Sequence, residues 1–338
     1  MGRMVRFGIV GFGLHAVKRL MPGFRLARNA RVTALSRRDA DKATASAREY
    51  GIAHAFTSAE KLCRSPEVDA VFVATPNNCH LRDVLVALEC GKPVLVEKPM
   101  AMNAAEARQM VEAARSRHLP FGVAQIFRFA ESVRRLRERV MAGEIGRVVF
   151  ARSEFSYSAG SHPRRWIHDA AIAGGGPIAD VGVHCVDALR FILNDEVASV
   201  SACGLAGKTP GTVESAAAVS LQFRRCGIGV VLVSARTQYR TPLEIVGEGG
   251  VLRAEDAFSV EKPVMIERQR ADGMETEQVS NHLAYARQVE AFADAVEARA
   301  AFPVPGEEGL KNQVILDAAY GSMRSGSVEE IVELATGG

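Results

Sequence analysis

Short apolar runs alternate with amphipathic stretches over the first third of the chain. Each apolar run is bounded by turn-forming or charged residues, which is typical of a buried strand. The predicted strands are residues 5–10, 31–35, 68–74, 93–96 and 121–124. Between them, apolar residues recur at helical spacing over 39–50, 81–89 and 104–117. Strands that alternate with helices predict βαβ units and a doubly wound parallel sheet, so we assign residues 1–123 to an α/β domain.

Beyond residue 123, predicted strands follow one another directly. This region opens with a helix at 133–142, a strand at 148–157 and a helix at 174–193. The β-type runs after it have no helices between them: 198–205, 215–223, 227–235, 242–247, 251–254 and 264–268. Strands joined without crossover helices indicate an open, mainly antiparallel sheet. With two closing helices, at 282–299 and 307–325, residues 124–338 are predicted to form an α+β domain.

Composition excludes several classes of protein. The 338 residues are 48% hydrophobic and 24% charged, as in ordinary globular domains, and a net charge of +3 gives no reason to expect a nucleic-acid partner. The six cysteines form no C-x-x-C pair, so we expect a reducing compartment, no disulfides and no metal site. No run approaches the ~18 apolar residues of a membrane span. We therefore expect a cytoplasmic protein with no membrane partner.

A glycine-rich segment follows the first predicted strand. Gly11-x-Gly13-x-x-Ala16 stands where that strand meets the next helix. Glycine at these positions permits a tight turn and the close approach of a pyrophosphate to the helix N-terminus. The first domain is therefore predicted to be a Rossmann domain that binds NAD(P). The loop residues predicted to contact this cofactor are Gly11, Phe12, Gly13, Leu14 and His15.

The end of the second strand bears on which dinucleotide binds. NAD sites usually carry an acidic residue there for the ribose 2′-hydroxyl, whereas this chain has Ser36, Arg37 and Arg38 before its first acid, Asp39. A hydroxyl and two guanidinium groups suit a 2′-phosphate, which accepts charge-assisted and bidentate hydrogen bonds. The sequence thus favours NADP, with NAD as the alternative, because two arginines in a surface loop can also be merely solvated.

Polar residues also follow the third and fourth strands. They are Thr75, Pro76, Asn77 and His80 after the third strand, and Glu97 and Lys98 after the fourth. The carboxyl ends of parallel strands share one edge of the sheet, where such domains bind ligands, so we expect these residues to contact the cofactor. His80 and His15 are expected to line it without reacting. Lys98 can hydrogen-bond a substrate hydroxyl, although a lysine at a strand end can also be simply solvated.

The segment 174–187 places a carboxylate and an imidazole four residues apart. Asp180 and His184 would share one face of the predicted helix. Three preceding glycines would let another molecule approach that face closely. Such a pair can transfer a proton near neutral pH, but a helix can also carry both residues with no catalytic role. Asp187 and Arg190 continue the face and are interpreted as a structural pair.

An irregular stretch at 157–168 supplies two further candidates. Arg165 and Trp166 are predicted to contact the cofactor or a polyhydroxylated substrate. Trp166 is the only tryptophan of the chain, and an aromatic face can pack against a sugar ring. The same side chain can equally anchor a core or an interface.

These motifs, in their order and spacing, resemble those of the Gfo/Idh/MocA oxidoreductases. The matching segments are Gly11-x-Gly13-x-x-Ala16, Ala74-Thr75-Pro76-Asn77-x-x-His80, Glu97-Lys98-Pro99, Gly175-Gly176-x-x-x-Asp180-x-x-x-His184-x-x-Asp187 and Ala318-Ala319-Tyr320-Gly321-Ser322. The resemblance covers nearly the whole chain. It implies a Rossmann domain followed by an α+β domain whose open sheet forms a homo-oligomer, a dimer or a tetramer.

The resemblance also implies an activity. Members of the family mostly transfer a hydride between NAD(P) and one carbon of a sugar, cyclitol or related polyol. The family's catalytic lysine matches Lys98, and its aspartate and histidine match Asp180 and His184. His184 is expected to act as general acid or base and Lys98 to hydrogen-bond the reacting oxygen. Asp180 would orient a hydroxyl or the lysine, or serve the structure. Which of Lys98 and His184 moves the proton stays open, because they would titrate as a coupled set.

Two alternatives involve other chemistry. A redox-neutral lyase or glycosidase would hold NAD tightly and oxidise its sugar only transiently, whereas the arginines at the second strand favour exchangeable NADP. A non-catalytic sensor would bind NAD(P) and a partner protein, and it would not need Lys98, Asp180 and His184.

Overall fold

The computed structural model describes residues 3–160, 163–207 and 212–332, and the chain divides into two compact units. Unit 1 comprises Met1–Ile126 and Leu283–Leu310, and unit 2 comprises Phe127–His282 and Lys311–Gly338. From the sequence we placed a single boundary after residue 123. The difference is the return of 283–310 to unit 1, which arises because α9 (Ala284–Val296) packs Phe292 against Phe7, with ring centroids 6.2 Å apart.

Unit 1 contains a six-stranded sheet in which every pair is parallel. Its strands are β1 (Val5–Val10), β2 (Ala30–Ser36), β3 (His54–Phe56), β4 (Ala70–Val73), β5 (Val94–Val96) and β6 (Phe121–Val123). The order β3-β2-β1-β4-β5-β6 reverses direction between β1 and β4, the place where doubly wound sheets bind ligands. The predicted doubly wound parallel sheet is confirmed, with β3 as an additional strand.

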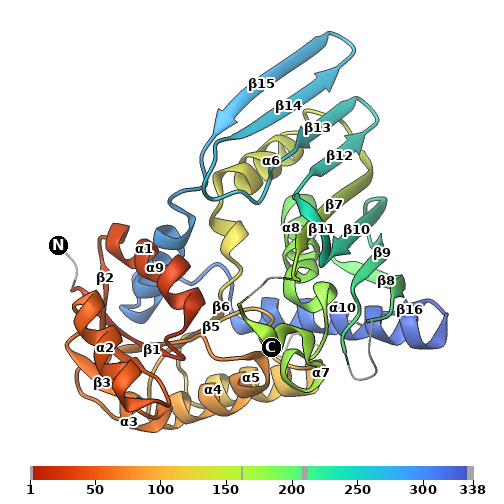
Figure 1. The fold of residues 1–338 in the computed structure, drawn as a ribbon. Helices are drawn as coiled ribbons and strands as arrows, with labels where there is room; N and C mark the ends of the chain where they lie inside the picture. Colours follow the sequence, from red (N-terminus) through yellow and green to blue (C-terminus); the bar gives the residue numbers. More distant parts are fainter. Residues whose placement is uncertain (1–2, 161–162, 208–211, 333–338) are drawn as a thin grey trace. The chain divides into compact units, whose positions relative to one another are not determined.

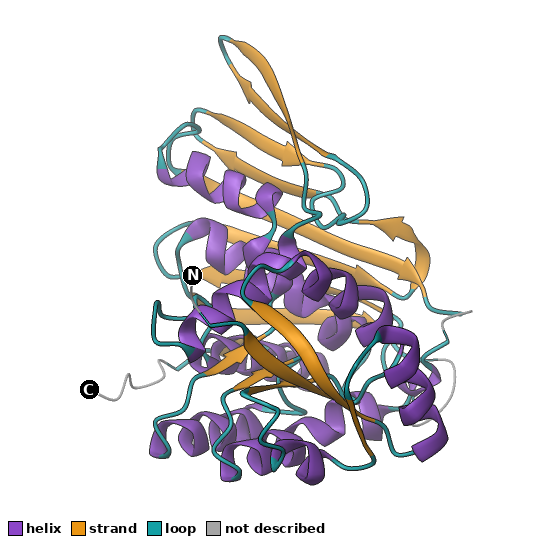
Figure 2. Ribbon diagram, turned by 90° about the vertical axis from the view of Figure 1, so that its left-hand side faces the viewer, coloured by secondary structure: helices purple, strands orange, loops and turns teal. Residues whose placement is uncertain are grey.

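Helices cover both faces of this sheet (Figure 2). They are η1 (Ala16–Leu20), α1 (Met21–Leu26), α2 (Ala40–Tyr50), α3 (Ala59–Cys63), η2 (Asn77–Cys79), α4 (His80–Glu89), α5 (Ala104–Ser116) and α9. On one face of β1, Phe7 lies against Phe24 of α1, with ring centroids 5.1 Å apart. On the other, a Cβ atom at Gly8 would lie 2.5 Å from the Leu62 side chain of α3, so the glycine lets this helix pack closely against the strand.

Unit 2 contains a ten-stranded sheet that is antiparallel except where β7 and β10 pair in parallel. Its strands are β7 (Val148–Ser158), β8 (Val197–Leu205), β9 (Ala216–Phe223), β10 (Ile228–Ser234), β11 (Arg236–Arg240), β12 (Leu243–Gly247), β13 (Gly250–Ala254), β14 (Val264–Arg270), β15 (Gly273–Val279) and β16 (Glu329–Glu330). The path runs β15-β14-β13-β12-β7-β10-β9-β8-β16, and β11 pairs with β7. The predicted mainly antiparallel sheet is therefore confirmed.

One face of the second sheet is covered by helices (Figure 1). The helical segments of this part of the chain are η3 (Ile126–Phe129), α6 (Glu131–Met141), η4 (Arg165–His168), α7 (Ala170–Ala173), η5 (Ile178–Gly182), α8 (Val183–Leu193) and α10 (Gly306–Ser325). The core lies where Val219 and Val231 of the sheet meet Val186 of α8 and Ile315 of α10. Within the described residues, no helix combines the length and the apolar character needed to cross a membrane.

Candidate active site

The glycine loop after β1 has room for a phosphate group. Gly11 has a φ of +85°, and a Cβ atom there would lie 2.7 Å from the backbone nitrogen of Thr75, so the loop lies directly against the segment that follows β4. At Gly13 an added Cβ would meet only the Gly11 oxygen, 3.9 Å away. The helical segment that begins at Ala16 has no acidic residue in its first turn. Open backbone at a helix N-terminus without negative charge fits the pyrophosphate of a dinucleotide.

The end of β2 lies beside this loop and holds one arginine in place. The backbone N–H of Phe12 donates to the Ser36 carbonyl at 3.0 Å, and Ser36 itself is buried. The Nη1 of Arg37 donates to Oγ of Ser46 in α2 at 2.8 Å. Arg38 is exposed to solvent. The three residues predicted to select the cofactor are therefore adjacent to the glycine loop, and Arg37 and Arg38 are held very differently.

The first acidic residue after β2 is committed to starting a helix. Asp39 is the N-cap of α2 and accepts the backbone N–H of Lys42 at 3.0 Å. Its second carboxylate oxygen lies 3.0 Å from Nζ of Lys42. The backbone N–H bond, followed by the contact with the Lys42 side chain, holds the pKa of Asp39 below its usual range. This carboxylate thus caps its own helix. It differs from the acidic residue of an NAD site, which binds the ribose 2′-hydroxyl.

The segments after β4 and β5 are joined by a buried histidine. Nδ1 of His80 lies 3.0 Å from the Pro99 carbonyl oxygen, and Nε2 lies 2.9 Å from the Thr75 carbonyl oxygen. Burial lowers the pKa of His80. With no exposed surface, this side chain supports both loops from behind, and the expectation that it lines the cofactor is corrected. Asn77, by contrast, keeps a small exposed fraction between these loops.

A second pair joins the glycine loop to the end of β5. Nε2 of His15 lies 2.8 Å from Oε1 of Glu97, and the backbone N–H of Lys98 donates to Oε2 of the same carboxylate at 3.2 Å. Burial acts to raise the pKa of Glu97, but the neighbouring His15 and Lys98 hold it below its usual range. Both residues were predicted as cofactor contacts, and their pairing was not. The Lys98 side chain is half-buried at the same edge.

In unit 2, the glycines before Asp180 pack against the protein itself. A Cβ atom at Gly175 would lie 1.9 Å from Oη of Tyr320, and one at Gly176 would lie 2.1 Å from the Glu214 carbonyl oxygen. The Glu214 carboxylate accepts the N–H of Gly176 at 2.8 Å and the N–H of Ile178 at 2.9 Å. The expectation that these glycines admit another molecule is wrong, because Tyr320 and Glu214 fill that space. Burial raises the pKa of Glu214.

Asp180 and His184 both face β7. The predicted continuous helix over 174–193 is instead a glycine turn at 174–176, the π-helical η5 and α8, so Asp180 lies in a π turn and His184 in an α-helix. Oη of Tyr157 donates to Oδ2 of Asp180 at 2.6 Å. The ring of His184 stacks on Phe155 with centroids 6.0 Å apart and meets Phe127 edge-on at 4.7 Å. Phe155 and Tyr157 are two residues apart in one strand and therefore share a face.

Tyr157 and the two phenylalanines were not predicted as site residues. Burial, and then the neighbouring Asp180 carboxylate, raises the pKa of Tyr157 well above its usual value, so its phenol stays a hydrogen-bond donor. The alternation Phe155-Ser156-Tyr157 at the end of a predicted strand is the signal that could have found it. The structure thus brings Asp180 and His184 together on one surface of unit 2. Lys98 belongs to unit 1, and its meeting with them stays a prediction.

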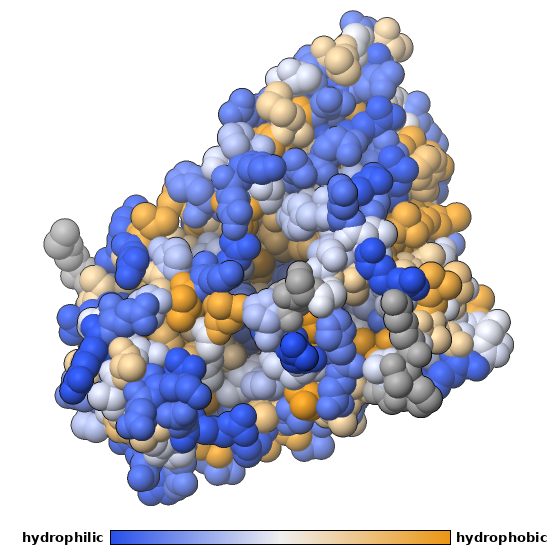
Figure 3. Space-filling view, viewed as in Figure 1, coloured by the Kyte–Doolittle hydropathy of each residue, from blue (hydrophilic) through white to orange (hydrophobic). Residues whose placement is uncertain are grey.

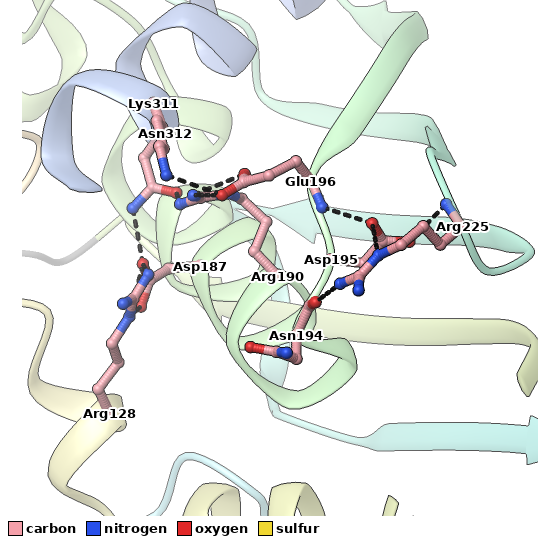
Figure 4. A network of polar contacts seen from close by, with 9 residues as sticks. All are labelled: Arg128, Asp187, Arg190, Asn194, Asp195, Glu196, Arg225, Lys311 and Asn312. Atoms are coloured by element: carbon pink, nitrogen blue, oxygen red, sulfur yellow. Dashed lines mark hydrogen bonds and ion pairs between the residues drawn. The ribbon is translucent and has the colours of Figure 1, made fainter. Parts of the chain in front are cut away.

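One turn beyond His184, α8 is anchored by a network of buried polar side chains (Figure 4). Arg128 donates to the Asp187 carboxylate through Nε at 2.9 Å and Nη2 at 2.7 Å, and Asn312 of α10 donates to it at 2.7 Å. Arg190 donates to the Asn312 side-chain oxygen at 2.7 Å and pairs with Glu196. Asp187 and Arg190 are therefore not a direct pair, because each has a better-placed partner and Asn312 bridges them.

The remaining predicted residues lie in η4 of unit 2. Arg165 is exposed and Trp166 is half-buried, with the guanidinium carbon of Arg164 5.8 Å from the centre of the Trp166 ring. Their contact with a cofactor stays a prediction. In the part of the chain that the structure describes, no three His, Cys, Asp or Glu side chains gather as metal ligands.

Comparisons with known proteins bear on this arrangement. Residues 5–125 match the oxidoreductase family with an NAD-binding Rossmann fold, and residues 133–253 match the GFO/IDH/MocA C-terminal domain. The 1,5-anhydro-D-fructose reductase of Ensifer adhaerens is 31% identical over 99% of this chain and 100% of its own length. The D-xylose 1-dehydrogenase (NADP(+)) 2 of Haloferax volcanii is 31% identical over 96% of this chain and 99% of its own.

Among solved structures, an aldose-aldose oxidoreductase from Caulobacter crescentus has a TM-score of 0.90 and 23% identity, over 97% of this chain and 100% of that one. At that identity the likeness shows the fold alone. The full-length relatives and the two matched domains confirm the resemblance that the motifs indicated. The chain belongs to the Gfo/Idh/MocA family of oxidoreductases, with an NAD-binding Rossmann domain at its N-terminus.

Proposed function

We propose that this chain is an NADP-dependent oxidoreductase that transfers a hydride between the nicotinamide and a carbinol or carbonyl carbon of a sugar, cyclitol or related polyol. The observation that carries the cofactor choice is the end of β2, where Arg37 is held by Ser46 and the Asp39 carboxylate is occupied as a helix cap. The substrate class is supported by two relatives, which are named for 1,5-anhydro-D-fructose and D-xylose.

The cofactor would be held by unit 1. The backbone of Gly11–His15 would receive the pyrophosphate, and Ser36, Arg37 and Arg38 would receive the 2′-phosphate. Thr75, Pro76 and Asn77 would line the same edge. Each hydrogen bond to a charged group contributes about 1.5–3 kcal/mol, so a single such bond favours NADP over NAD by roughly tenfold to a hundredfold. When bound, the nicotinamide supplies or accepts the hydride.

The protein's own groups would handle the proton and the developing charge. His184 would protonate the ketone oxygen on reduction or remove its proton on oxidation, and Phe127 and Phe155 restrict the orientation of its ring. Lys98 would hydrogen-bond the same oxygen and stabilise the negative charge that develops on it. Asp180, held by the phenol of Tyr157, would orient a neighbouring substrate hydroxyl.

The two alternatives remain distinguishable from this proposal. A lyase or glycosidase that regenerates tightly held NAD would have no use for the 2′-phosphate contact that we propose for Arg37, which Ser46 holds. A non-catalytic sensor has no use for a carboxylate and an imidazole placed together at Asp180 and His184. Both features support the exchangeable-cofactor enzyme.

We also propose that the chain forms a homo-oligomer through the sheet of unit 2. The uncovered face of this sheet exposes 43% of Phe150, 47% of Ile228 and 40% of Leu232. Phe150 and Ile228 are register partners in β7 and β10, so they form one apolar area. Apolar side chains gather over the neighbouring strands on the right of Figure 3. Ile228→Arg should shift the sedimentation coefficient to that of a smaller species; an unchanged coefficient would assign the assembly, if any, to another surface.

The first test of the proposed function is titration with NADPH and NADH, followed by nicotinamide fluorescence. We expect reversible binding with NADPH preferred, and then turnover in a panel that includes 1,5-anhydro-D-fructose and D-xylose. Lys98→Ala and His184→Ala should each lower kcat by ~10²-fold or more with little change in the Kd for NADPH. Preference for NADH, or cofactor that is already bound and does not exchange, would overturn the proposal in favour of the redox-neutral alternative.

A further inference from the structure

We propose that Ser46 is a positioning residue for cofactor selectivity. It holds the Arg37 guanidinium in the orientation that receives a 2′-phosphate. The inference rests on the proposed preference for NADP. It adds a residue that lies ten positions beyond the end of β2 and belongs to no motif of the sequence.

The main chain at Arg37 is fixed on both sides. Before it, the Ser36 carbonyl accepts the Phe12 N–H at 3.0 Å, which ties the end of β2 to the glycine loop. At Arg37 itself, the backbone N–H donates to the Phe56 carbonyl of β3 at 3.1 Å. The Cα atom of Arg37 is therefore held between the glycine loop and the neighbouring strand. Only the side-chain torsions are left to be set.

Ser46 sets the far end of that side chain. It lies in α2 with 5% of its surface exposed, and its Oγ accepts one N–H of Arg37 Nη1 at 2.8 Å. A guanidinium carries five N–H donors in a rigid fork, so this bond leaves four for a phosphate. Serine is a weaker helix former than alanine, and at this buried position its hydroxyl is used by Arg37.

Arg38 provides the internal contrast. It is exposed, and among the described residues its side chain has no hydrogen-bond or ion-pair partner. Two adjacent arginines thus differ in one respect, since Arg37 is placed before a ligand arrives and Arg38 is not. Ordering a long, flexible side chain on binding costs conformational entropy, and a side chain that is already ordered avoids most of that cost. Arg37 is therefore the stronger 2′-phosphate contact of the two.

Removing the hydroxyl should weaken only the cofactor that carries a 2′-phosphate. Ser46→Ala is expected to raise the Kd for NADPH by roughly threefold to tenfold, the scale of immobilising one such side chain. The Kd for NADH should stay nearly unchanged, because NADH carries no 2′-phosphate for the Arg37 guanidinium to bind. Ser46→Thr, which keeps a hydroxyl on Cβ, should restore most of the NADPH affinity.

The experiment is a fluorescence titration of NADPH and NADH against wild type and five variants, including Ser46→Thr. Thr44→Ala is the matched control, because it removes a Cβ hydroxyl from the exposed face of the same helix and should change neither Kd. Arg37→Ala should weaken NADPH more than Ser46→Ala does. In the double variant Ser46→Ala with Arg37→Ala, the serine substitution should add nothing. Competition by adenosine 2′,5′-bisphosphate repeats the comparison without a nicotinamide.

Each outcome separates this inference from the proposed function. Suppose that Ser46→Ala weakens the binding of NADPH and NADH equally, or changes neither Kd, while Arg37→Ala still weakens NADPH binding selectively. The NADP proposal then stands and the role of Ser46 is refuted. The same holds if Ser46→Ala and Arg37→Ala are additive. If wild type prefers NADH, or Arg37→Ala leaves NADPH binding intact, the NADP proposal fails and the positioning role fails with it.

Discussion

Asp187→Asn is expected to destabilise unit 2 strongly while changing almost no volume. The Asp187 carboxylate lies in α8, three residues from His184, and is surrounded by Arg128 and Asn312. The side chains of Arg128 and Asp187 are only 7% and 3% exposed. An asparagine keeps the shape and one acceptor oxygen, so Asn312 retains a partner. The guanidinium, however, keeps its charge and loses the bidentate carboxylate that faces it.

The magnitude follows from that burial. Removing one member of a buried ion pair costs about 3–5 kcal/mol, because the other charge is left uncompensated. The retained amide contact places this substitution near the lower end, about 3 kcal/mol. For a folding unit of this size, each kcal/mol shifts the midpoint by about 2–4 °C, so a fall of about 6–12 °C is expected.

Thermal unfolding followed by circular dichroism measures this effect, with urea unfolding for the free energy. Glu138→Gln is the control, since it makes the same chemical change at an exposed ion pair of the same unit, where Glu138 is 54% and its partner Arg135 38% exposed. We expect less than about 1 kcal/mol there. Combining Asp187→Asn with Arg128→Met should recover part of the loss, because it also removes the buried positive charge that faced Asp187. Equal, small losses in both single variants would show that the guanidinium is solvated, and would refute the reasoning.

Three further substitutions test other contacts. Gly175→Ala should lower the melting temperature by several degrees in calorimetry, because its Cβ would lie 1.9 Å from Oη of Tyr320; wild-type melting would mean that the turn moves aside freely. Tyr157→Phe removes the 2.6 Å bond to Asp180 and should lower kcat about tenfold with the Kd for NADPH unchanged, whereas unchanged kcat would remove the phenol from the site. Burial acts to raise the pKa of Asp195, but backbone N–H groups of the β9–β10 turn hold it below its usual value. A carboxyl pKa that is lower in the folded than in the unfolded state adds stability above about pH 4, and this stability is lost as the pH falls through the folded-state pKa. The free energy of unfolding in urea should therefore fall less between pH 5 and pH 3 for Asp195→Asn than for the wild type. An equal loss in wild type and variant would contradict this.

The buried strands could be predicted from the sequence. Strands that are exposed or very short were missed. All four residues of β4 are buried, so its apolar run was visible in the sequence. β11, by contrast, has all five residues exposed, and β15 has five of its seven residues exposed. These strands are held by backbone pairing to neighbours, which leaves no apolar pattern to read. β3 was missed for the related reason that it has only three residues, none of them buried.

The site could be predicted in position but not in its internal contacts. The motifs located the glycine loop, the ends of β2, β4 and β5, and the segment with Asp180 and His184. The break of the helix at 174–193 was not predicted, because apolar periodicity does not separate a π turn from an α-helix over five residues. The glycines were misread because Glu214, which fills the space beside Gly176, lies 38 residues away in the sequence.

Three predicted polar residues of the site are held by partners that their own motifs do not contain. Arg37 is held by Ser46, Asp180 by Tyr157, and His15 lies against Glu97, which belongs to a different motif. Binding and catalysis both depend on side chains that are already oriented when the ligand arrives, because orienting them afterwards costs affinity or rate. Two chains with identical motifs can therefore differ in cofactor preference through the holding residue alone. For this chain, the choice between NADPH and NADH should consequently respond to the Ser46 hydroxyl of α2, which acts by holding Arg37.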